Sequence, residues 1–133
     1  MSKLSFGRGY VYHIQYHIVW CVKYRKKILT GEIGDKIKEL IKEIAEDNEF
    51  SIIEMETNKD HIHLLINCKP QHYIPNIMKA LKGVSSRKLF MFYPELKNSL
   101  WGGHLWNPSY FVSTVSENTE DEIKEYISKQ EEK

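Results

Sequence analysis

Apolar and polar residues alternate along residues 12–23 of the chain. One set of alternate positions is mainly apolar and consists of Ile14, Tyr16, Ile18, Trp20 and Val22. The intervening positions are His13, Gln15, His17, Val19 and Cys21. A period of two residues is typical of a β-strand with one face against a core, so this segment is predicted to be a strand.

Two later segments repeat their apolar residues with the spacing of a helix. The first contains Ile33, Ile37, Leu40, Ile41 and Ile44, with charged residues between them. The second contains Ile74, Ile77, Met78, Leu81, Ser85, Leu89 and Phe92. Both patterns predict amphipathic helices, and Pro94 is expected to end the second one. Gly83 weakens the second pattern, or else allows another backbone to approach closely.

The remaining segments complete an alternating order of strands and helices. Ser51–Thr57 and residues 61–67 flank the turn-prone Asn58-Lys59-Asp60, which predicts an antiparallel hairpin. Residues 105–115 return to strand character, interrupted by Pro108. Residues 120–129 form the last predicted helix.

The order β-α-β-β-α-β-α indicates an α+β fold. Its first six elements match the ferredoxin-like split βαβ arrangement, which is an antiparallel sheet with two helices on one face. We expect one domain over residues 1–133, with the ferredoxin-like core in residues 1–115 and a terminal helical segment in residues 116–133. The other face of the sheet is expected to stay free and to carry a binding surface.

Composition favours a folded protein of the cytoplasm. The chain has 133 residues, of which 41% are hydrophobic and 12% aromatic, and this suffices for one domain with a core. No apolar run approaches the length of a membrane span, and the first ten residues lack the hydrophobic segment of a signal peptide. Cys21 and Cys68 are too few for a disulfide framework, so a reducing compartment is expected.

The distribution of charged residues along the chain is more informative than the net charge of +1. Basic residues form two clusters, which consist of Lys23, Arg25, Lys26 and Lys27 and of Lys79, Lys82, Arg87 and Lys88. Acidic residues gather elsewhere, in residues 32–56 and 117–132. This segregation favours a local phosphate-binding surface on a nearly neutral protein, although each cluster alone is also consistent with an ordinary solvated face.

His61 and His63 are the first candidate for chemistry. The strand period directs Ile62 and Leu64 to the core and both imidazoles to the opposite face, roughly 6–7 Å apart along the strand. Two neutral imidazoles at this spacing can chelate one metal ion, and Asp60 is placed to orient one of them from behind. The alternative is a pair of ordinary polar residues on an exposed sheet face.

Tyr126 and Gln130 are the second candidate. They are four residues apart near the end of the last predicted helix and so share a face. A tyrosine there can act as a nucleophile, and the glutamine carbonyl can be a third metal ligand. The alternative is packing of Tyr126 at the edge of the apolar stripe that contains Ile123 and Ile127.

Four segments in order resemble one known family. They are Tyr16-His17-Ile18-Val19-Trp20-Cys21-Val22-Lys23-Tyr24-Arg25, His61-Ile62-His63-Leu64-Leu65, Lys82-Gly83-Val84-Ser85-Ser86-Arg87 and the stretch from His104-Leu105-Trp106-Asn107-Pro108 to Val115, followed by Tyr126 and Gln130. Together they resemble the HUH single-tyrosine transposases of the TnpA type, in the superfamily that includes the REP-associated tyrosine transposases. The resemblance extends over nearly the whole chain.

The resemblance implies roles for individual residues. His61, His63 and Gln130 correspond to the metal ligands and Tyr126 to the nucleophile, with Mg²⁺ or Mn²⁺ as the expected metal. It also implies a ferredoxin-like fold and a homodimer in which the tyrosine helix of one subunit can complete the histidine site of the other. Family members often carry glycine where Ser116 stands, which puts the freedom of the hinge before the last helix in question.

The expected function is therefore cleavage and rejoining of single-stranded DNA through a 5′-phosphotyrosine intermediate. Expected partners are single strands with hairpins at the element ends, contacted by Arg25, Lys82, Ser86 and Arg87. One alternative is a domesticated transposase that acts on dispersed repeats. Another is a non-enzymatic module that binds single-stranded nucleic acid.

Overall fold

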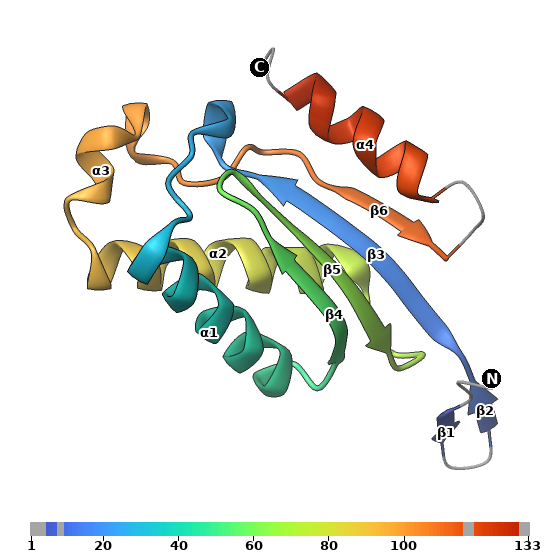
Figure 1. Cartoon of the computed structure of the whole chain (residues 1–133). Coiled ribbons are helices and arrows are strands. Elements are labelled where there is room, and N and C mark those ends of the chain that lie inside the picture. The colour runs from blue at the N-terminus through green and yellow to red at the C-terminus, as the bar shows by residue number, and fades with distance from the viewer. Residues whose placement is uncertain (1–4, 8–9, 116–118, 131–133) are drawn as a thin grey trace.

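The computed structural model describes residues 5–7, 10–115 and 119–130 (Figure 1). The strands are β1 (Ser5–Gly7), β2 (Tyr10–Tyr12), β3 (Ile14–Cys21), β4 (Ser51–Thr57), β5 (His61–Cys68) and β6 (Phe111–Thr114). The helices are α1 (Gly31–Asp47), α2 (Ile74–Phe92), α3 (Leu96–Ser99) and α4 (Thr119–Lys129), with 3₁₀ turns η1 (Lys23–Arg25) and η2 (Trp101–Gly103). Ser116 lies outside the described residues.

The main sheet has four antiparallel strands in the order β4-β5-β3-β6. The first and third strands of the βαββαβ unit, β3 and β5, are therefore the central pair. Helices α1 and α2 pack against each other on one face of this sheet, as Figure 1 shows. The structure confirms the predicted α+β fold with its ferredoxin-like strand order.

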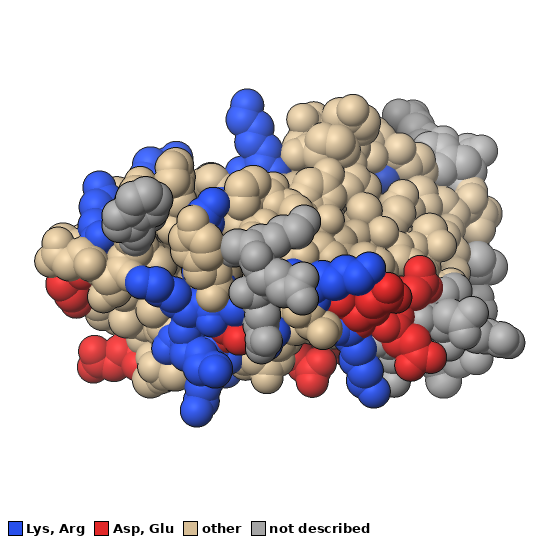
Figure 2. All heavy atoms as spheres, turned by 90° about the horizontal axis from the view of Figure 1, so that it is seen from above, with Lys and Arg blue, Asp and Glu red and all other residues tan. Residues whose placement is uncertain are grey.

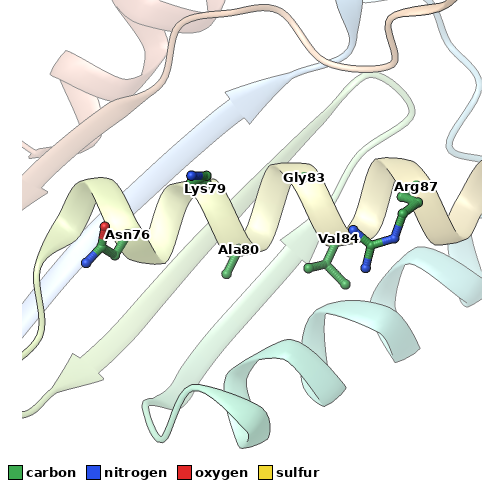
Figure 3. Close-up of a pocket in the computed structure, with 6 residues that line it drawn as sticks. All are labelled: Asn76, Lys79, Ala80, Gly83, Val84 and Arg87. Carbon is green, nitrogen blue, oxygen red and sulfur yellow. The ribbon is translucent and has the colours of Figure 1, made fainter.

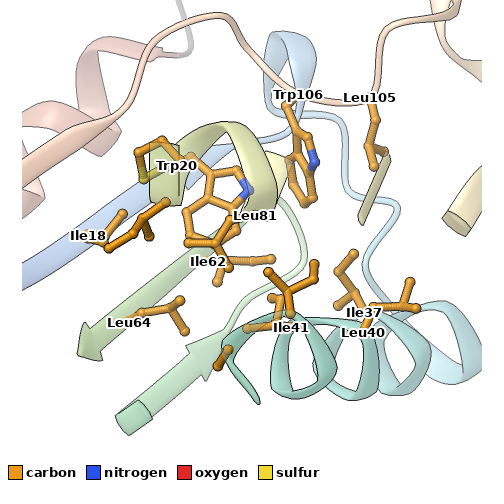
Figure 4. Close-up of a cluster of buried hydrophobic side chains, with 14 of the residues drawn as sticks. Ile18, Trp20, Ile37, Leu40, Ile41, Ile62, Leu64, Leu81, Leu105 and Trp106 are labelled. Carbon is orange, nitrogen blue, oxygen red and sulfur yellow. The ribbon is translucent and has the colours of Figure 1, made fainter. Parts of the chain in front are cut away.

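The hydrophobic core lies between this sheet and the two helices (Figure 4). The alternation in β3 and β5 supplies Ile18, Trp20, Ile62 and Leu64, all fully buried. The predicted apolar stripes of the helices meet them, and Ile37 and Leu81 are also fully buried. Burial of large aliphatic side chains at this density stabilises the fold and fixes which face each neighbouring residue presents.

The opposite face of the sheet is not free, and the expectation that it would be is wrong. Val19 and Cys21 point to this face but are both fully buried. Helix α4 contacts β3 and β6 there and covers part of the sheet (Figure 1). The apolar residues of α4, such as Ile123 with 6% of its surface exposed, gain burial by this packing.

Two strand predictions are too long. Of the first predicted strand, residues 12–23, the regular strand of the main sheet is β3 (Ile14–Cys21); Tyr12 instead ends β2, which pairs with β1 in a separate two-stranded ribbon. The strand predicted for residues 105–115 contains only Phe111–Thr114 as a regular element, preceded by an isolated bridge between Trp106 and Val22. Pro108 explains the second difference, because proline has no backbone N–H to donate to a neighbouring strand.

Gly83 does not serve a close internal packing contact. A Cβ atom added at this position would meet nothing within 4 Å, apart from the helix itself. Among the described residues, therefore, no neighbouring backbone of this chain approaches Gly83 closely. Among the described helices, none combines the length and hydrophobicity that a bilayer crossing requires.

Burial in the core predicts a large difference between two isoleucines on adjacent strands. Ile66 of β5 is fully buried, whereas Ile53 of β4 is 45% exposed. Ile66→Ala should lower the free energy of unfolding by about 3 kcal/mol, and Ile53→Ala by less than about 1 kcal/mol. Urea denaturation measures both, and equal losses would contradict the assignment of the core.

Candidate active site

His61 and His63 project from the centre of the sheet on the face opposite the core. The residues of β5 alternate between partly exposed and buried along the whole strand, and Ile62 between the two histidines is fully buried. In the register with β3, His61 lies opposite Cys21 and His63 opposite Val19. The two-residue strand period therefore orients both imidazoles as predicted.

Hydrogen bonds fix the protonation pattern of His61. Its Nδ1 lies 2.7 Å from Oδ1 of Asp60, a carboxylate that can only accept, so Nδ1–H is the donor. The amide Nδ2 of Asn58 lies 2.9 Å from Nε2 of the same ring and donates to it. The lone pair of His61 therefore resides on Nε2, while the Asp60 carboxylate is bonded to the other nitrogen of the ring.

His63 has a similar arrangement with different partners. Its Nδ1 lies 3.4 Å from Oε2 of Glu56 on β4, and its Nε2 lies 2.9 Å from Nδ1 of His17 on β3. When Nδ1–H of His63 donates to Glu56, Nε2 carries the lone pair and accepts from Nδ1–H of His17. The His17 and His63 rings are 5.2 Å apart between centroids.

The two imidazoles have the donor chemistry of a divalent metal site. Each ring has a carboxylate at Nδ1, an arrangement that fixes the tautomer and the orientation of a metal-binding imidazole. Imidazole nitrogen suits first-row transition metals, including Mn²⁺. Within the residues that the structure describes, no group of three or more His, Cys, Asp or Glu side chains is arranged to hold a metal.

A pocket of about 390 Å³ lies between the histidine pair and α4. The sheet contributes Glu56, His61 and His63 to its lining, and the helix contributes Ile123, Lys124 and Ile127. An anionic ligand in this pocket would meet the Lys124 side chain of α4 on one side and the imidazoles on the other. The lining also includes the Glu56 carboxylate, so the charged side chains at the pocket are one cation and one anion beside the two imidazoles.

Tyr126 and Gln130 lie together, but on a different side of α4 from this pocket. The Tyr126 hydroxyl lies 2.8 Å from Oγ of Ser109, and Gln130 Oε1 lies 3.3 Å from the same Oγ. The phenol ring also packs against Phe111, with 5.9 Å between the ring centroids. Gln130 is 3% exposed. The structure thus unites these two predicted residues with each other, but not with the histidine pair.

Asn107 determines which atom donates in this cluster. The backbone N–H and the hydroxyl of Ser109 both lie 3.0 Å from Asn107 Oδ1, which identifies that atom as the acceptor. A serine hydroxyl has one proton, and both Asn107 Oδ1 and Gln130 Oε1 lie within its reach as acceptors, so Tyr126 is the group that has a proton to donate to Ser109 Oγ. Burial raises the pKa of the Tyr126 phenol above its ordinary value. In this position the phenol is protonated and a poor nucleophile.

The loop that carries Ser109 is held by Lys82 from α2. The Lys82 ammonium donates to the backbone carbonyls of Asn107 and Ser109, at 2.7 and 3.1 Å. Burial lowers the pKa of this amine, and the two carbonyls accept from two of the three N–H groups of its ammonium form. The ammonium that was expected to contact DNA is therefore engaged within the protein.

The other basic residues occupy two surfaces. Arg25 lies beside the histidine site and contacts Asp60, while Arg87 lies on the exposed side of α2. An open pocket of about 390 Å³ lies along α2 and is lined by the residues labelled in Figure 3, which are Asn76, Lys79, Ala80, Gly83, Val84 and Arg87. In Figure 2, basic side chains gather mainly on the left of the face seen, and the largest acidic group lies on the right.

Three contacts in the site were missed by sequence reasoning. The register of β3 with β5 places His17 beside His63, and the sequence pattern alone does not give this register. Glu56 lies across the hairpin from His63, and a known hairpin register would have predicted this contact. Ser109 belongs to an irregular segment, so no periodic pattern placed it beside Tyr126.

Comparison with known proteins places this geometry in a family. Residues 10–130 match the protein family described as "Transposase IS200 like". The chain belongs to this family. The transposase is 53% identical over 127 residues to the ISDra2 transposase TnpA of Deinococcus radiodurans, covering 96% of this chain and 91% of the relative. It is 33% identical over 119 residues to the IS200 transposase of Salmonella typhimurium, covering 90% and 78%.

Solved structures agree with this assignment. A crystal structure described as a transposase of Deinococcus radiodurans R1 matches with a TM-score of 0.90 and 47% identity, covering 95% of this chain and 97% of that one. A REP-associated tyrosine transposase bound to a REP hairpin shares the fold, with a TM-score of 0.56 and 14% identity, covering 93% and 68%. The resemblance to TnpA-type transposases is confirmed, and membership implies that the protein cleaves and transfers DNA.

Tyr126 should give the transposase a pH-dependent stability at alkaline pH. Because the pKa of the phenol is raised on folding from 10.0, the folded state holds this proton more tightly than the unfolded chain does. The stabilisation is present below the unfolded pKa and is lost as pH rises through the folded pKa. Denaturation experiments above about pH 10 should show a steeper loss of stability in the parent protein than in Tyr126→Phe.

Tyr73→Phe is the matched control for this experiment, since Tyr73 is 64% exposed. This variant should keep the alkaline slope of the parent protein. Identical slopes in the parent and Tyr126→Phe would contradict the buried, protonated state of Tyr126.

Proposed function

We propose that the transposase cleaves and rejoins single-stranded DNA with Tyr126 as the nucleophile and a divalent ion on His61 and His63. The observation that carries this proposal is the pair of oriented imidazoles, each with a carboxylate at Nδ1 and an acceptor nitrogen on the same face of the sheet. The helix that bears the tyrosine lines the same pocket as this pair. A protein that only binds DNA has no need of such a pair.

His61 and His63 would hold the ion, and Gln130 is the third ligand that the family resemblance implies. When bound, Mg²⁺ or Mn²⁺ would supply Lewis acidity toward a phosphate oxygen. Asp60 keeps His61 in the tautomer that can bind metal, and Glu56 does the same for His63. The carbonyl oxygen of Gln130 is a suitable ligand atom once it separates from Ser109.

In each step of the proposed reaction one P–O bond forms as another breaks, so the number of phosphodiesters stays the same. The Tyr126 oxygen attacks phosphorus, the bond to the 3′-oxygen breaks, and the phenol proton passes to solvent or to the leaving oxygen. The products are a 5′-phosphotyrosine and a free 3′-hydroxyl. A 3′-hydroxyl from another DNA end then attacks the phosphotyrosine and releases the phenol, so no ATP is required.

The docked position of Tyr126 corresponds to a resting state. Its hydroxyl is bonded to Ser109 rather than directed into the pocket of the histidine pair. In the proposed cycle α4 leaves Ser109 and presents Tyr126 and Gln130 to a histidine pair, in its own subunit or in a partner. We propose that the transposase is a homodimer, in which either route is available.

DNA would lie along the exposed side of α2 as well as in the pocket. Arg87 and Lys79 lie two helical turns apart along the surface that Gly83 leaves open. Ser86 lies in the adjoining groove with Arg87 and Lys97. Such a basic surface is suited to the phosphates of a folded single strand, and the structural relative bound to a REP hairpin supports hairpins as the ligand.

Two other functions are distinguishable by experiment. A domesticated transposase acting on dispersed repeats would share all of this chemistry, and the DNA that flanks the gene separates it from a mobile element. A non-enzymatic binding module would retain single-stranded DNA without forming a covalent link. The oriented histidine pair favours the enzyme.

Tyr126→Phe should abolish formation of the covalent intermediate while DNA binding persists. The measurement uses a 3′-labelled single-stranded oligonucleotide from the flanking DNA, incubated with Mn²⁺ and separated by denaturing electrophoresis. The parent protein should yield a labelled band at the position of the protein. The variant should lose it by at least about 10³-fold, because no other group supplies the attacking oxygen.

Two further variants complete this experiment. His63→Ala should lose both the covalent band and the binding of Mn²⁺, measured by electron paramagnetic resonance of the free ion. Tyr73→Phe, at the start of α2, should behave as the parent protein. A persistent covalent band in Tyr126→Phe would refute the nucleophile, and unchanged Mn²⁺ binding in His63→Ala would refute the metal site.

Arg87→Ala should weaken binding of a hairpin-bearing single strand. Loss of one phosphate contact is expected to reduce the salt dependence of binding. The slope of the logarithm of the binding constant against the logarithm of the salt concentration should become smaller in magnitude by about 1. Fluorescence anisotropy at several salt concentrations measures this. Lys38→Ala on α1 removes an exposed cation away from the α2 surface and should leave the slope unchanged. Equal slopes in both variants would exclude Arg87 from the interface.

A further inference from the structure

Arg25 lies in a turn with an unusual backbone directly after the central strand β3. Tyr24 and Arg25 have φ angles of 57° and 51°, a left-handed conformation that is costly for residues with a side chain. The turn is closed by a bond from Arg25 N to Val22 O at 2.7 Å. Val22 N in turn bonds to the carbonyl of Asp60 at 2.8 Å. The backbone therefore holds the guanidinium next to the start of β5.

The guanidinium bridges two parts of the site. Its Nε donates to Oδ2 of Asp60 at 3.1 Å, and its Nη1 donates to the backbone carbonyl of Ile127 in α4 at 3.2 Å. The side chains of Arg25 and Asp60 are 17% and 7% exposed. Because the planar guanidinium presents several donors in fixed directions, one residue can hold both partners at once.

Asp60 extends this bridge to the histidine pair. Its Oδ2 receives the bond from Arg25, and its Oδ1 receives the bond from His61 Nδ1. A buried carboxylate needs a charged partner, and Arg25 provides it. The contacts thus run without a break from the α4 backbone through Arg25 and Asp60 to His61.

We propose that Arg25 is a positioning residue that couples the docking of α4 to the orientation of His61. While α4 is docked, both ends of the guanidinium are engaged. When α4 leaves, the Nη1 group loses the Ile127 carbonyl, and the Arg25–Asp60 pair becomes free to reorient with His61. The biological meaning of this coupling rests on the proposed function, but the coupling itself is a property of the protein without DNA.

Among the described contacts, Asp60 does not bond to α4 directly. A change at Asp60 should nevertheless weaken the docking of α4, because Asp60 anchors Arg25. The experiment is amide hydrogen exchange of the full chain in the absence of DNA and added metal, followed in residues 121–130. Asp60→Asn removes the charge that anchors Arg25. Arg25→Lys keeps a positive charge beside Asp60 but lacks the second donor in the required direction. Both variants should accelerate exchange in α4 by about tenfold.

Asn58→Ala is the matched control. Asn58 also bonds to His61, but through Nε2 and without contact to Arg25, so exchange in α4 should stay as in the parent protein. A second measurement is the affinity for Mn²⁺, again by electron paramagnetic resonance. Arg25→Lys should weaken it by about tenfold through Asp60 and His61.

The proposal is overturned if Asp60→Asn and Arg25→Lys leave the exchange of α4 unchanged. It is also overturned if exchange in β3 and β5 accelerates as much as in α4, because the effect is then a general loss of stability. If the covalent band fails to form but Asp60→Asn and Arg25→Lys accelerate exchange in α4 as expected, the proposed chemistry is rejected and the coupling stands.

Discussion

The two-residue period of the central strand β5 determines most of this structure. Ile62, Leu64 and Ile66 must face the core, because each gains the free energy of complete burial there. The histidines between and before them are consequently fixed on the other face. A shift of the register by one residue would bury the imidazoles and expose three large aliphatic side chains. The same burial that stabilises the fold therefore orients the candidate metal ligands.

Helix α4 then converts an exposed sheet face into a covered site. Its residues Ile123 and Ile127 line one side of the pocket at the histidine pair, while Tyr126 and Gln130 contact the irregular segment that carries Ser109. Two separate polar clusters result, one on each side of a single helix. The helix contacts both clusters, so its position relative to the sheet determines which residues of α4 meet the imidazoles.

The sequence predicted the elements in which apolar and polar residues recur with a regular period. The extents of β4 and α2, the placement of the histidines and the order of the elements follow from alternation, helical spacing and Pro94, all of which are local. The position of α4 was not predictable, because the period of a helix does not say which surface its apolar stripe will meet. Likewise, the bonds of Lys82 and Ser109 depend on an irregular loop around Pro108, where no repeat exists to interpret.

The burial of Cys21 has a practical consequence. This thiol lies on the face that α4 covers, and burial raises its pKa to about 11. Alkylating reagents attack the thiolate, and a thiol with this raised pKa holds little thiolate at neutral pH. The reagents also cannot reach a side chain with no exposed surface. Cys21 is therefore an intrinsic chemical probe whose rate of labelling reports the opening of the covered face.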